Sequence, residues 1–279
     1  MAVSCGRFRC GVVRSEHSYC GSVTTPPTDT PPRTVSAHAS DHIRFWWHAA
    51  AGRGYEPDLY RVLEDDERDL LLEWYDETLR LKMVGEMAVP MASTLLGLVN
   101  GSGIRRIAQL GHFAGYSCLM LGWALRRMGA PNGLFSIDLS KKFTEYTRGW
   151  IDRAGLAGHV GLHTSDSASP DAVEAARAYL GGDPACVVID SSHQYEHTVA
   201  ELDLWYPSLV PGGLLVLHDA SPMAAQYDRT GQGGVRRALD EWLARAGAPP
   251  ALTLMGPEKH GQDGPYADPS GLCLIQKPW

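Results

Sequence analysis

The segment "IRRIAQLGHFAGYSCLMLGWALRRM", residues 104–128, sets the fold class because a short apolar run leads through a glycine turn into a helical stretch. Four more pairs of an apolar run and a helical stretch follow it, with the runs at residues 133–140, 159–166, 185–190 and 212–219. Strands that are joined by helices pair in parallel, since a crossover connection returns the chain to the same edge of the sheet. The pattern therefore predicts an α/β fold with a doubly wound, mostly parallel sheet.

The last two predicted strands break this alternation. Residues 251–256 and 271–277 are both apolar, and only a loop rich in Gly, Pro and Asp joins them. Two strands without a helix between them pair antiparallel. We therefore expect a seven-stranded sheet that ends in an antiparallel hairpin.

An extension and a helical segment precede the predicted sheet. Residues 1–40 contain a Pro-, Thr- and Ser-rich stretch that cannot bury enough apolar surface to become ordered, so we expect a disordered extension there. Residues 41–100 are expected to form a helical cap or lid on a Rossmann-like domain at 101–279. One helix of this cap starts at Asp65 or Asp66 and carries an apolar stripe at spacings of three and four, formed by Leu72, Tyr75, Leu79 and Met83.

The composition argues against several classes of function. A net charge of −7 and a pI near 5.9 give no support for binding to nucleic acid or to an anionic membrane. No run of about 18 apolar residues is present to span a bilayer. Cys5, Cys10 and Cys20 lie near His17 but lack the paired spacing of zinc modules. Three other cysteines lie singly in apolar stretches, which is typical of reduced, buried thiols and favours a cytoplasmic protein: Cys118, Cys186 and Cys273.

The first strand ends in a turn with two glycines. Ligands of open α/β sheets bind outside the carboxyl ends of the strands, so residues at these ends carry the functional signal. Gly111 and Gly115 let the backbone approach a ligand, and the next helix offers free N–H groups. The turn lacks the third glycine of a dinucleotide fingerprint and the Gly-Lys-Ser/Thr of a phosphate loop. Close packing explains two glycines equally well, so both interpretations stay open.

Acidic residues end the second and third strands. A carboxylate at the position of Asp138 can accept hydrogen bonds from both hydroxyls of a ribose. Its alternative role is to cap the next helix, which Ser140 can also do. Asp166 is placed to meet the edge of an adenine ring and is equally suited to be a cap. Together with the glycine turn, Asp138 favours recognition of a nucleoside.

The fourth and fifth strands end in aspartates and histidines. Neighbouring strands would bring Asp190 and Asp219 together, with His193 and His218 beside them. Two such carboxylates either bind a hard cation such as Mg²⁺ or perturb the pKa of one another. A neutral histidine within reach is a suitable general base near neutral pH. The alternative is a set of polar loop residues that only satisfy one another.

These strand ends resemble the class I S-adenosylmethionine-dependent methyltransferases, specifically their small-molecule O-methyltransferase branch, over about residues 80–279. Residues 82–117 are similar to the lead-in and glycine loop of catechol- and caffeoyl-CoA-type O-methyltransferases. Residues 187–219, which begin with "VVIDSSHQYEHT", are similar to the macrolide-sugar O-methyltransferase and cephalosporin-hydroxylase-like group. In that group a D-x-x-H element and a later strand-end Asp serve a Mg²⁺ site.

The resemblance implies a function and a set of site residues. The implied reaction is methyl transfer to a hydroxyl of a small molecule, a natural-product or sugar-like acceptor, in a homo-oligomeric enzyme. His193 is the implied general base, and Asp190 and Asp219 are the implied Mg²⁺ ligands. The residues implied to bind S-adenosylmethionine are Gly111, Phe113, Gly115, Ser117, Asp138, Asp166 and Ser167.

Two positions depart from the pattern of these enzymes. Gln109 stands where the first strand usually ends in an acidic residue, and His218 precedes Asp219 where many metal-dependent relatives have two adjacent acids. Imidazole suits Mg²⁺ poorly. Three alternatives stay open: the same fold with non-methylating chemistry such as cyclisation or a hydroxylase-linked step, a non-catalytic cofactor-binding partner, and a Rossmann dehydrogenase. The missing third glycine and the terminal hairpin count against the dehydrogenase.

Overall fold

The computed structural model describes residues 57–247, 249–257 and 266–279. The predictions made for residues 1–40, which include the N-terminal cysteines, and for residues 41–56 lie outside the described residues. In the described part of the chain, no helix is long and apolar enough to cross a membrane.

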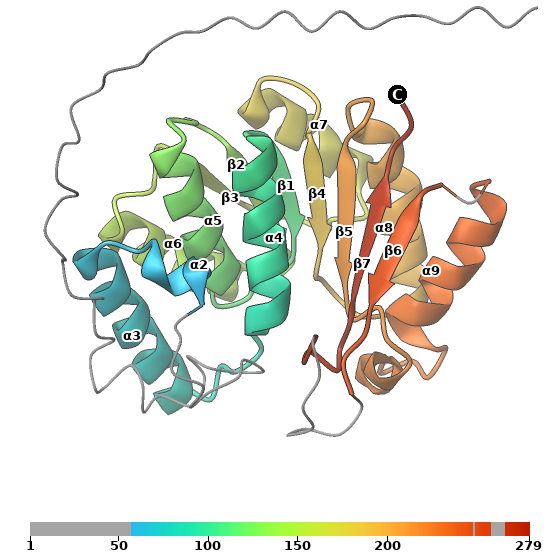
Figure 1. Ribbon diagram of the computed structural model, residues 1–279, viewed down its shortest axis with the longest axis horizontal. Helices are drawn as coiled ribbons and strands as arrows, with labels where there is room; N and C mark the ends of the chain where they lie inside the picture. The colour runs from blue at the N-terminus through green and yellow to red at the C-terminus, as the bar shows by residue number, and fades with distance from the viewer. Residues whose placement is uncertain (1–56, 248, 258–265) are drawn as a thin grey trace, which may run out of the picture. The chain divides into compact units, whose positions relative to one another are not determined.

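The seven predicted strands form one sheet in the order β3-β2-β1-β4-β5-β7-β6 (Figure 1). Strands β1 to β5 are parallel, and β7 pairs antiparallel with both β5 and β6. This arrangement confirms the predicted parallel sheet with its antiparallel hairpin. The strands are β1 (Ile107–Leu110), β2 (Leu134–Asp138), β3 (Val160–Thr164), β4 (Cys186–Ile189), β5 (Leu214–His218), β6 (Ala251–Leu254) and β7 (Leu272–Gln276).

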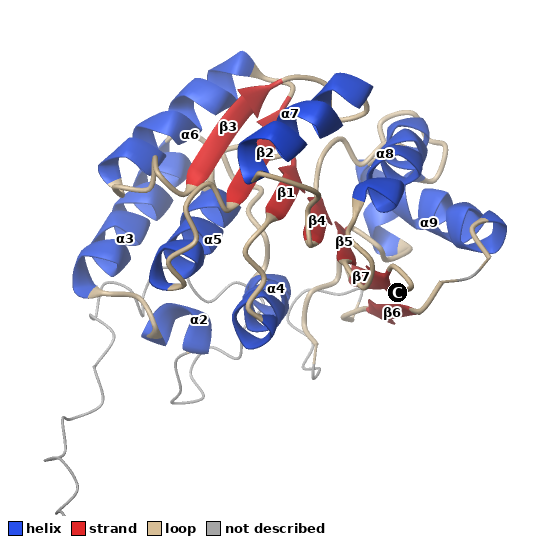
Figure 2. Ribbon diagram, turned by 90° about the horizontal axis from the view of Figure 1, so that it is seen from above, coloured by secondary structure: helices blue, strands red, loops and turns tan. Residues whose placement is uncertain are grey.

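Helices cover both faces of the sheet, as Figure 2 shows. One face carries α4 (Val89–Ser102), α5 (Tyr116–Arg127) and α6 (Lys141–Arg153), with α2 (Asp58–Arg61) and α3 (Asp65–Arg80) packed outside them. The other face carries α7 (Pro170–Leu180), α8 (Tyr195–Ser208) and α9 (Gly234–Arg245). A short 3-10 helix, η1 (Met223–Tyr227), lies between β5 and α9.

Each face of the sheet contributes to its own hydrophobic core. Ile107 and Val188 point into the core under α2 to α6, whereas Ala108 and Val187 point into the core under α7 to α9. A strand that is buried on both faces reads as a continuous apolar run, which is why the parallel strands could be recognised in the sequence.

Helix α3 begins at Asp65, as predicted, but its buried stripe differs from the predicted one. Leu72 and Tyr75 are buried, whereas the Leu79 side chain is 49% exposed and Met83 lies beyond the end of the helix. The rings of Trp74 and Tyr75 pack on Tyr116 of α5, so this face, and not that of Leu79, meets the domain.

The described part of the predicted cap is helical and shares its core with the sheet. Met91, Leu95 and Val99 of α4 are buried in the same cluster as Ile107 of β1. A buried carboxylate on α3, Glu67, accepts hydrogen bonds from two arginines of α5. Residue 100 therefore does not separate two hydrophobic cores.

Candidate active site

A cavity of about 810 Å³ lies at the carboxyl ends of β1 to β4, and we call it the glycine-loop cavity. The loop 111–117 after β1 forms one wall, and residues 190–194 after β4 form another. Strands β1 and β4 are the neighbours between which the strand order reverses, and open α/β sheets bind ligands at such a point. The volume lies in the range of about 300–1,000 Å³ that is typical of small-molecule sites.

Close packing accounts for both glycines of the loop. A Cβ atom on Gly111 would lie 2.0 Å from the carbonyl oxygen of Asp190, and one on Gly115 would lie 2.7 Å from the Thr147 side chain. Both residues also have positive φ, at 88° and 96°, which glycine adopts without strain. Packing was one of the two interpretations left open by the sequence. Because Gly111 has no side chain, the backbone of the glycine loop packs directly on the backbone of Asp190 and Ser191.

Gln109 holds the two ends of the glycine loop together. Its buried amide donates hydrogen bonds to the carbonyl of Gly111, at 2.7 Å, and to the Ser117 hydroxyl, at 2.6 Å. A carboxylate at this position could accept from Ser117 but could not donate to a carbonyl. Gln109, which stands where related enzymes have an acidic residue, therefore stabilises the loop through the hydrogen bond to the carbonyl of Gly111, which a carboxylate could not donate.

Asp138, the last residue of β2, lines the glycine-loop cavity. Its carboxylate accepts hydrogen bonds from the backbone N–H of Phe113, at 2.9 Å, and of Ser140, at 2.8 Å. The Ser140 hydroxyl accepts from the N–H of Phe143 and is the N-cap of α6. The capping role that was left open between the two residues thus belongs to Ser140.

Apolar side chains form the wall next to Asp138. Phe113 and Phe143 pack with ring centroids 4.6 Å apart, and Leu139 beside them is 78% exposed. All three line the glycine-loop cavity. An exposed leucine and two rings beside a carboxylate suit a ligand that has an aromatic ring and a polar substituent.

A buried ionic network closes the far side of this cavity. Glu201 of α8 is fully buried and accepts hydrogen bonds from the hydroxyls of Ser167, at 2.5 Å, and Ser191, at 2.8 Å. The His197 ring lies between Glu201, 3.5 Å from its carboxylate, and Asp166, 3.0 Å away. Glu201 is the largest cause that raises the pKa of His197 to about 9, and Asp166 adds to it. His197 is therefore a cation at neutral pH.

A second cavity, of about 730 Å³, adjoins the first at the ends of β4 and β5, and we call it the histidine cavity. Residues 190–194 line both cavities, and so does Arg229. Other parts of its wall come from the segment before α4, from the end of β5, from η1 and from residues 268–270, which precede β7. The segment after β4 thus faces both cavities.

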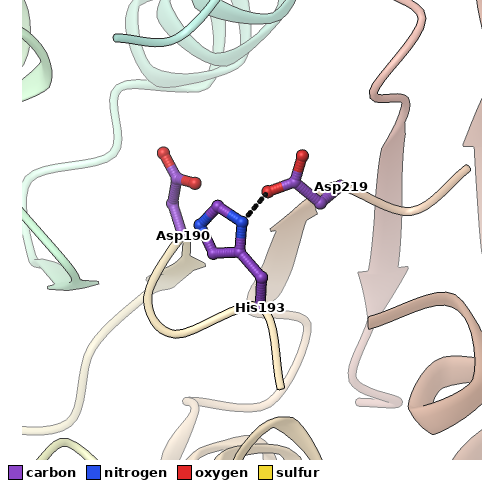
Figure 3. Close-up of side chains that lie close together, drawn as sticks. All are labelled: Asp190, His193 and Asp219. Carbon is purple, nitrogen blue, oxygen red and sulfur yellow. Dashed lines mark ion pairs between the residues drawn. The ribbon is translucent and has the colours of Figure 1, made fainter. Parts of the chain in front are cut away.

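Asp190, His193 and Asp219 lie close together where β4 and β5 end (Figure 3). Nδ1 of His193 lies 3.2 Å from Oδ2 of Asp219, and the ring lies between the two carboxylates. His193 and Asp219 both have positive φ, at 62° and 57°. Non-glycine residues in this conformation cost of order 1–3 kcal/mol and concentrate at functional sites. The predicted convergence of these three residues is present.

The neighbouring His218 is surrounded by carboxylates. Strand register pairs Ile189 with Leu217, so His218 comes directly beside Asp190. Nδ1 of His218 lies 3.2 Å from Oδ1 of Asp190, and Nε2 lies 3.2 Å from Oδ2 of the buried Asp268. Burial alone would lower the pKa of His218, but the charges of Asp219 and Asp190 and the hydrogen bonds to Asp190 and Asp268 raise it well above its usual value.

Known proteins share this architecture. Residues 108–220 match the model of a family described as a methyltransferase domain, and this stretch includes the glycine loop and the His193 cluster. An O-methyltransferase from Bacillus cereus in complex with S-adenosylhomocysteine matches with a TM-score of 0.60 and 19% identity, over 77% of this chain and 92% of that chain. The chain has the fold of the class I methyltransferases.

Two further solved structures share the class I methyltransferase fold with this chain. TomG from Streptomyces achromogenes, an O-methyltransferase involved in tomaymycin synthesis and solved with S-adenosylmethionine, has a TM-score of 0.56 and 22% identity, over 78% of this chain and 91% of that chain. A methyltransferase from Podospora anserina has a TM-score of 0.53 and 15% identity, over 78% of this chain and 88% of that chain. No significant match was found among the curated proteins.

Asp190 and His193 form the D-x-x-H element, and Asp219 is the later strand-end aspartate, that the resemblance implies for a Mg²⁺ site. Asp190, His193 and Asp219 each offer a donor atom, and these atoms lie within 4.8 Å of one another. One of the three donors is nitrogen, whereas Mg²⁺ prefers oxygen ligands in octahedral geometry. His218 brings a second imidazole to Asp190 and lies 3.7 Å from Asp219. The mixed donor set therefore suits a divalent transition ion better than Mg²⁺.

The charges of the groups around Asp190 act on one another. Burial would raise the pKa of the Asp190 carboxyl, but the charge and hydrogen bond of His218 outweigh burial and lower it. Burial raises the pKa of the Asp219 carboxyl, against the opposite effect of His218 and His193. Asp190 is thus held ionised, while Asp219 holds a proton more readily than an ordinary aspartate.

The charge of His197 gives a testable pH dependence. A histidine whose pKa is raised to about 9 in the folded state stabilises the fold fully below about pH 6.5, its unfolded value, and loses this effect as the pH rises through about 9. We expect wild type to exceed His197→Gln in unfolding free energy by on the order of 2 kcal/mol at pH 6 and by little at pH 10. Urea unfolding at both pH values measures the difference.

His163→Gln on β3 is the matched control for this comparison, because no carboxylate partner of His163 is found in the described part of the chain. A constant difference between wild type and His197→Gln across this pH range would show that His197 is not the charged member of the network.

Proposed function

We propose that the chain transfers a methyl group from S-adenosylmethionine to a hydroxyl of a small molecule. The observation that carries this proposal is the position of His193, which lines both cavities and has Asp219 beside it in the histidine cavity. A nucleotide-like methyl donor in one cavity and an acceptor in the other would meet at this wall. The class I methyltransferase fold supports the choice of donor.

The glycine-loop cavity suits S-adenosylmethionine in three respects. Asp138 offers carboxylate oxygens for the ribose hydroxyls at the end of β2. Leu139 and Phe143 supply apolar surface for the adenine, with Asp166 at the same cavity wall. The loop from Gly111 to Ser117 would surround the methionine part next to residues 190–194. Phe113 and Ser167 complete the proposed set of cofactor-binding residues.

The histidine cavity suits a polar acceptor. Carboxylates, imidazoles, two amides and hydroxyls line it, and Arg229 lines both this cavity and the glycine-loop cavity. A hydroxyl-rich, sugar-like molecule matches such a wall better than an apolar ring does. Tyr227, whose ring meets His193 edge-on with centroids 5.9 Å apart, offers one flat surface for the acceptor.

The protein's part in the reaction is alignment and proton removal. S-adenosylmethionine supplies a methyl group on a sulfonium, which leaves as a neutral thioether after in-line displacement. Nδ1 of His193 lies 3.2 Å from Oδ2 of Asp219, and a proton on Nδ1 beside this carboxylate would leave Nε2 as the proton acceptor. His193 takes the acceptor's hydroxyl proton as the new C–O bond forms, and Asp219 stabilises the resulting imidazolium. General-base assistance of this kind contributes about 10²- to 10⁴-fold in rate.

Two other functions are consistent with the same fold. One is use of the cofactor for cyclisation or hydroxylase-linked chemistry, and the other is non-catalytic binding of the cofactor. Incubation with S-adenosylmethionine and a panel of glycosides and phenols separates them, because only methyl transfer raises the acceptor mass by one methyl group. Consumption of the cofactor without a methylated product would contradict the proposal.

Asp138→Ala should weaken binding of S-adenosylhomocysteine. The variant removes the carboxylate proposed to hold the ribose and also the acceptor of the Phe113 N–H. Hydrogen bonds to a charged group contribute about 1.5–3 kcal/mol, so we expect affinity to fall about 10- to 100-fold. Isothermal titration calorimetry measures the change, with the exposed Asp152→Ala on α6 as the control. Unchanged affinity would remove Asp138 from the cofactor site.

A further inference from the structure

Arg229 lines both the glycine-loop cavity and the histidine cavity. Among the described residues that line either cavity, no other is a lysine or an arginine. Arg229 lies in the loop between η1 and α9, two residues after Tyr227, whose ring meets that of His193. The loop therefore brings a permanent positive charge to the region where the donor and the acceptor are proposed to meet.

The buried side chain of Asp228 fixes the backbone of this loop. Oδ1 of Asp228, a residue that is 5% exposed, accepts hydrogen bonds from the backbone N–H and the hydroxyl of Thr230, at 2.9 and 2.6 Å. Oδ2 accepts from the backbone N–H groups of Gln232, at 3.0 Å, and Gly234, at 2.9 Å. These four bonds close the turn without the Arg229 side chain, which is exposed. The fold therefore does not need this side chain to be an arginine.

The same loop packs on the segment that carries His193. A Cβ atom on Gly234 would lie 3.1 Å from the carbonyl oxygen of His193, so the two backbones approach closely. The Gln232 side chain also donates a hydrogen bond to Glu196 of α8, at 3.0 Å. The loop of Arg229 and the backbone of His193 are thus held together, and both residues line the histidine cavity. One bound molecule can contact both.

The charge of Arg229 is not offset by an ion pair in the described part of the chain. Arg236 and Arg237, on the next helix, each form an ion pair with a carboxylate four residues later, at 2.7 and 2.8 Å. Their charges are used within the protein. That of Arg229 is open to a ligand.

The carboxylates of the histidine cavity have other partners. Asp190, Asp219 and Asp268 each have an oxygen 3.2 Å from an imidazole nitrogen. Glu86, which also lines both cavities, accepts a hydrogen bond from the backbone N–H of Gly85, and no ion pair joins it to Arg229 among the described residues. The guanidinium therefore lacks an anion that the bound molecule can supply.

We infer that Arg229 binds a carboxylate of the acceptor, so that the substrate is a hydroxy acid such as a uronic-acid sugar. The guanidinium offers two parallel N–H donors, which match the two oxygens of a carboxylate. In this arrangement His193 takes the hydroxyl proton while Arg229 holds the acid of the same molecule. The inference rests on the proposed function, because it names the class of acceptor for that reaction. Arg229 is a specificity-determining residue in it.

Calorimetric titration with matched pairs of acceptors tests the inference. The members of each pair differ in the acid: phenyl β-glucuronide against phenyl β-glucoside, and 4-hydroxybenzoate against 4-hydroxybenzamide. Wild type, titrated with and without S-adenosylhomocysteine, is expected to bind the acid of at least one pair about 10- to 100-fold more tightly than its neutral partner, as for hydrogen bonds to a charged group. Arg229→Gln should lower this preference to less than about twofold, and Arg229→Lys should keep part of it.

Arg80→Gln at the end of α3 is the matched control, because it removes an exposed arginine that lines neither cavity. This variant should keep the full preference for the acid. Wild type that prefers the acid in neither pair would overturn the inference. A preference that Arg229→Gln retains would also overturn it, since another group would then bind the carboxylate.

S-adenosylhomocysteine titrated alone distinguishes the acceptor from the donor, whose methionine part also carries a carboxylate. Arg229→Gln is expected to change the affinity for this ligand by less than about twofold. A larger loss would assign Arg229 to the donor and overturn the inference. Preference for the acid without any methyl transfer would contradict the proposed function and leave the binding role of Arg229 in place. Methyl transfer to neutral acceptors without preference for the acid would do the reverse.

Discussion

Replacing His193 with alanine is expected to lower kcat by about 10²- to 10⁴-fold and to change the affinity for S-adenosylhomocysteine by less than about twofold. The hydroxyl of a sugar-like acceptor is barely acidic, so the transition state depends on a base within reach. His193 lies on the wall shared by the two cavities and has Asp219 3.2 Å from Nδ1, which leaves Nε2 as the base. Steady-state kinetics with an acceptor found by the panel, together with calorimetry, measures both quantities.

Two further variants distinguish a base from a structural histidine. Asp219→Asn would change the partner of Nδ1 and should lower kcat while shifting the acidic limb of the pH–rate profile, because the partner sets the tautomer and basicity of the ring. His159→Ala serves as the control, since His159 hydrogen-bonds the carbonyl of Ala130 far from the site. Wild-type turnover by His193→Ala would show that another group accepts the proton.

Replacing Gly111 with alanine is expected to lower the free energy of unfolding by about 3 to 5 kcal/mol. The added Cβ would lie 2.0 Å from the carbonyl oxygen of Asp190 and 2.9 Å from the Cα of Ser191, so backbone atoms and not flexible side chains must move. The φ of 88° adds the strain of a non-glycine residue in this region. Each effect alone is worth about 1–3 kcal/mol. Urea unfolding of wild type and variant measures the sum.

Gly97→Ala is the matched control for this substitution. Gly97 is exposed in the middle of α4, and nothing lies within 4 Å of its added Cβ. Alanine there should raise stability by about 0.5–1 kcal/mol because glycine is a poor helix former. Equal unfolding midpoints for wild type and Gly111→Ala would mean that the loop relaxes, and the contact with Asp190 would then not hold the two site segments together.

The sheet could be predicted because its signals are local. Each parallel strand is buried on both faces and therefore appears as an unbroken apolar run, and each is followed by a helical stretch. The terminal hairpin was visible because no helix separates its strands. The buried face of α3 was predicted less well. The packing of the large Trp74 and Tyr75 rings on Tyr116, and not residue spacing alone, determines which face of the helix is buried.

The site could be predicted as far as it depends on strand ends. Asp138, Asp190, His193 and Asp219 all lie at or just after a strand, and the parallel register gathers them at one edge of the sheet. Their placement follows from topology, whereas their roles in binding and catalysis stay predictions until the experiments above are done.

Residues whose roles depend on contacts between distant segments were missed. His197 and Glu201 lie four residues apart on α8, a spacing that predicts one helix face, but nothing local showed that Glu201 would be fully buried under Ser167 and Ser191. Asp268 lies in a loop rich in Gly, Pro and Asp, where one more aspartate carries no signal. Its pairing with His218 arises only when β7 pairs with β5.

A crystal structure of the chain with S-adenosylhomocysteine tests the central claim most directly. The proposal predicts the ligand in the glycine-loop cavity, with its ribose hydroxyls on the carboxylate of Asp138 and its sulfur directed at His193 and the histidine cavity. A ligand that binds elsewhere, or whose sulfur points away from His193, would contradict methyl transfer at this wall.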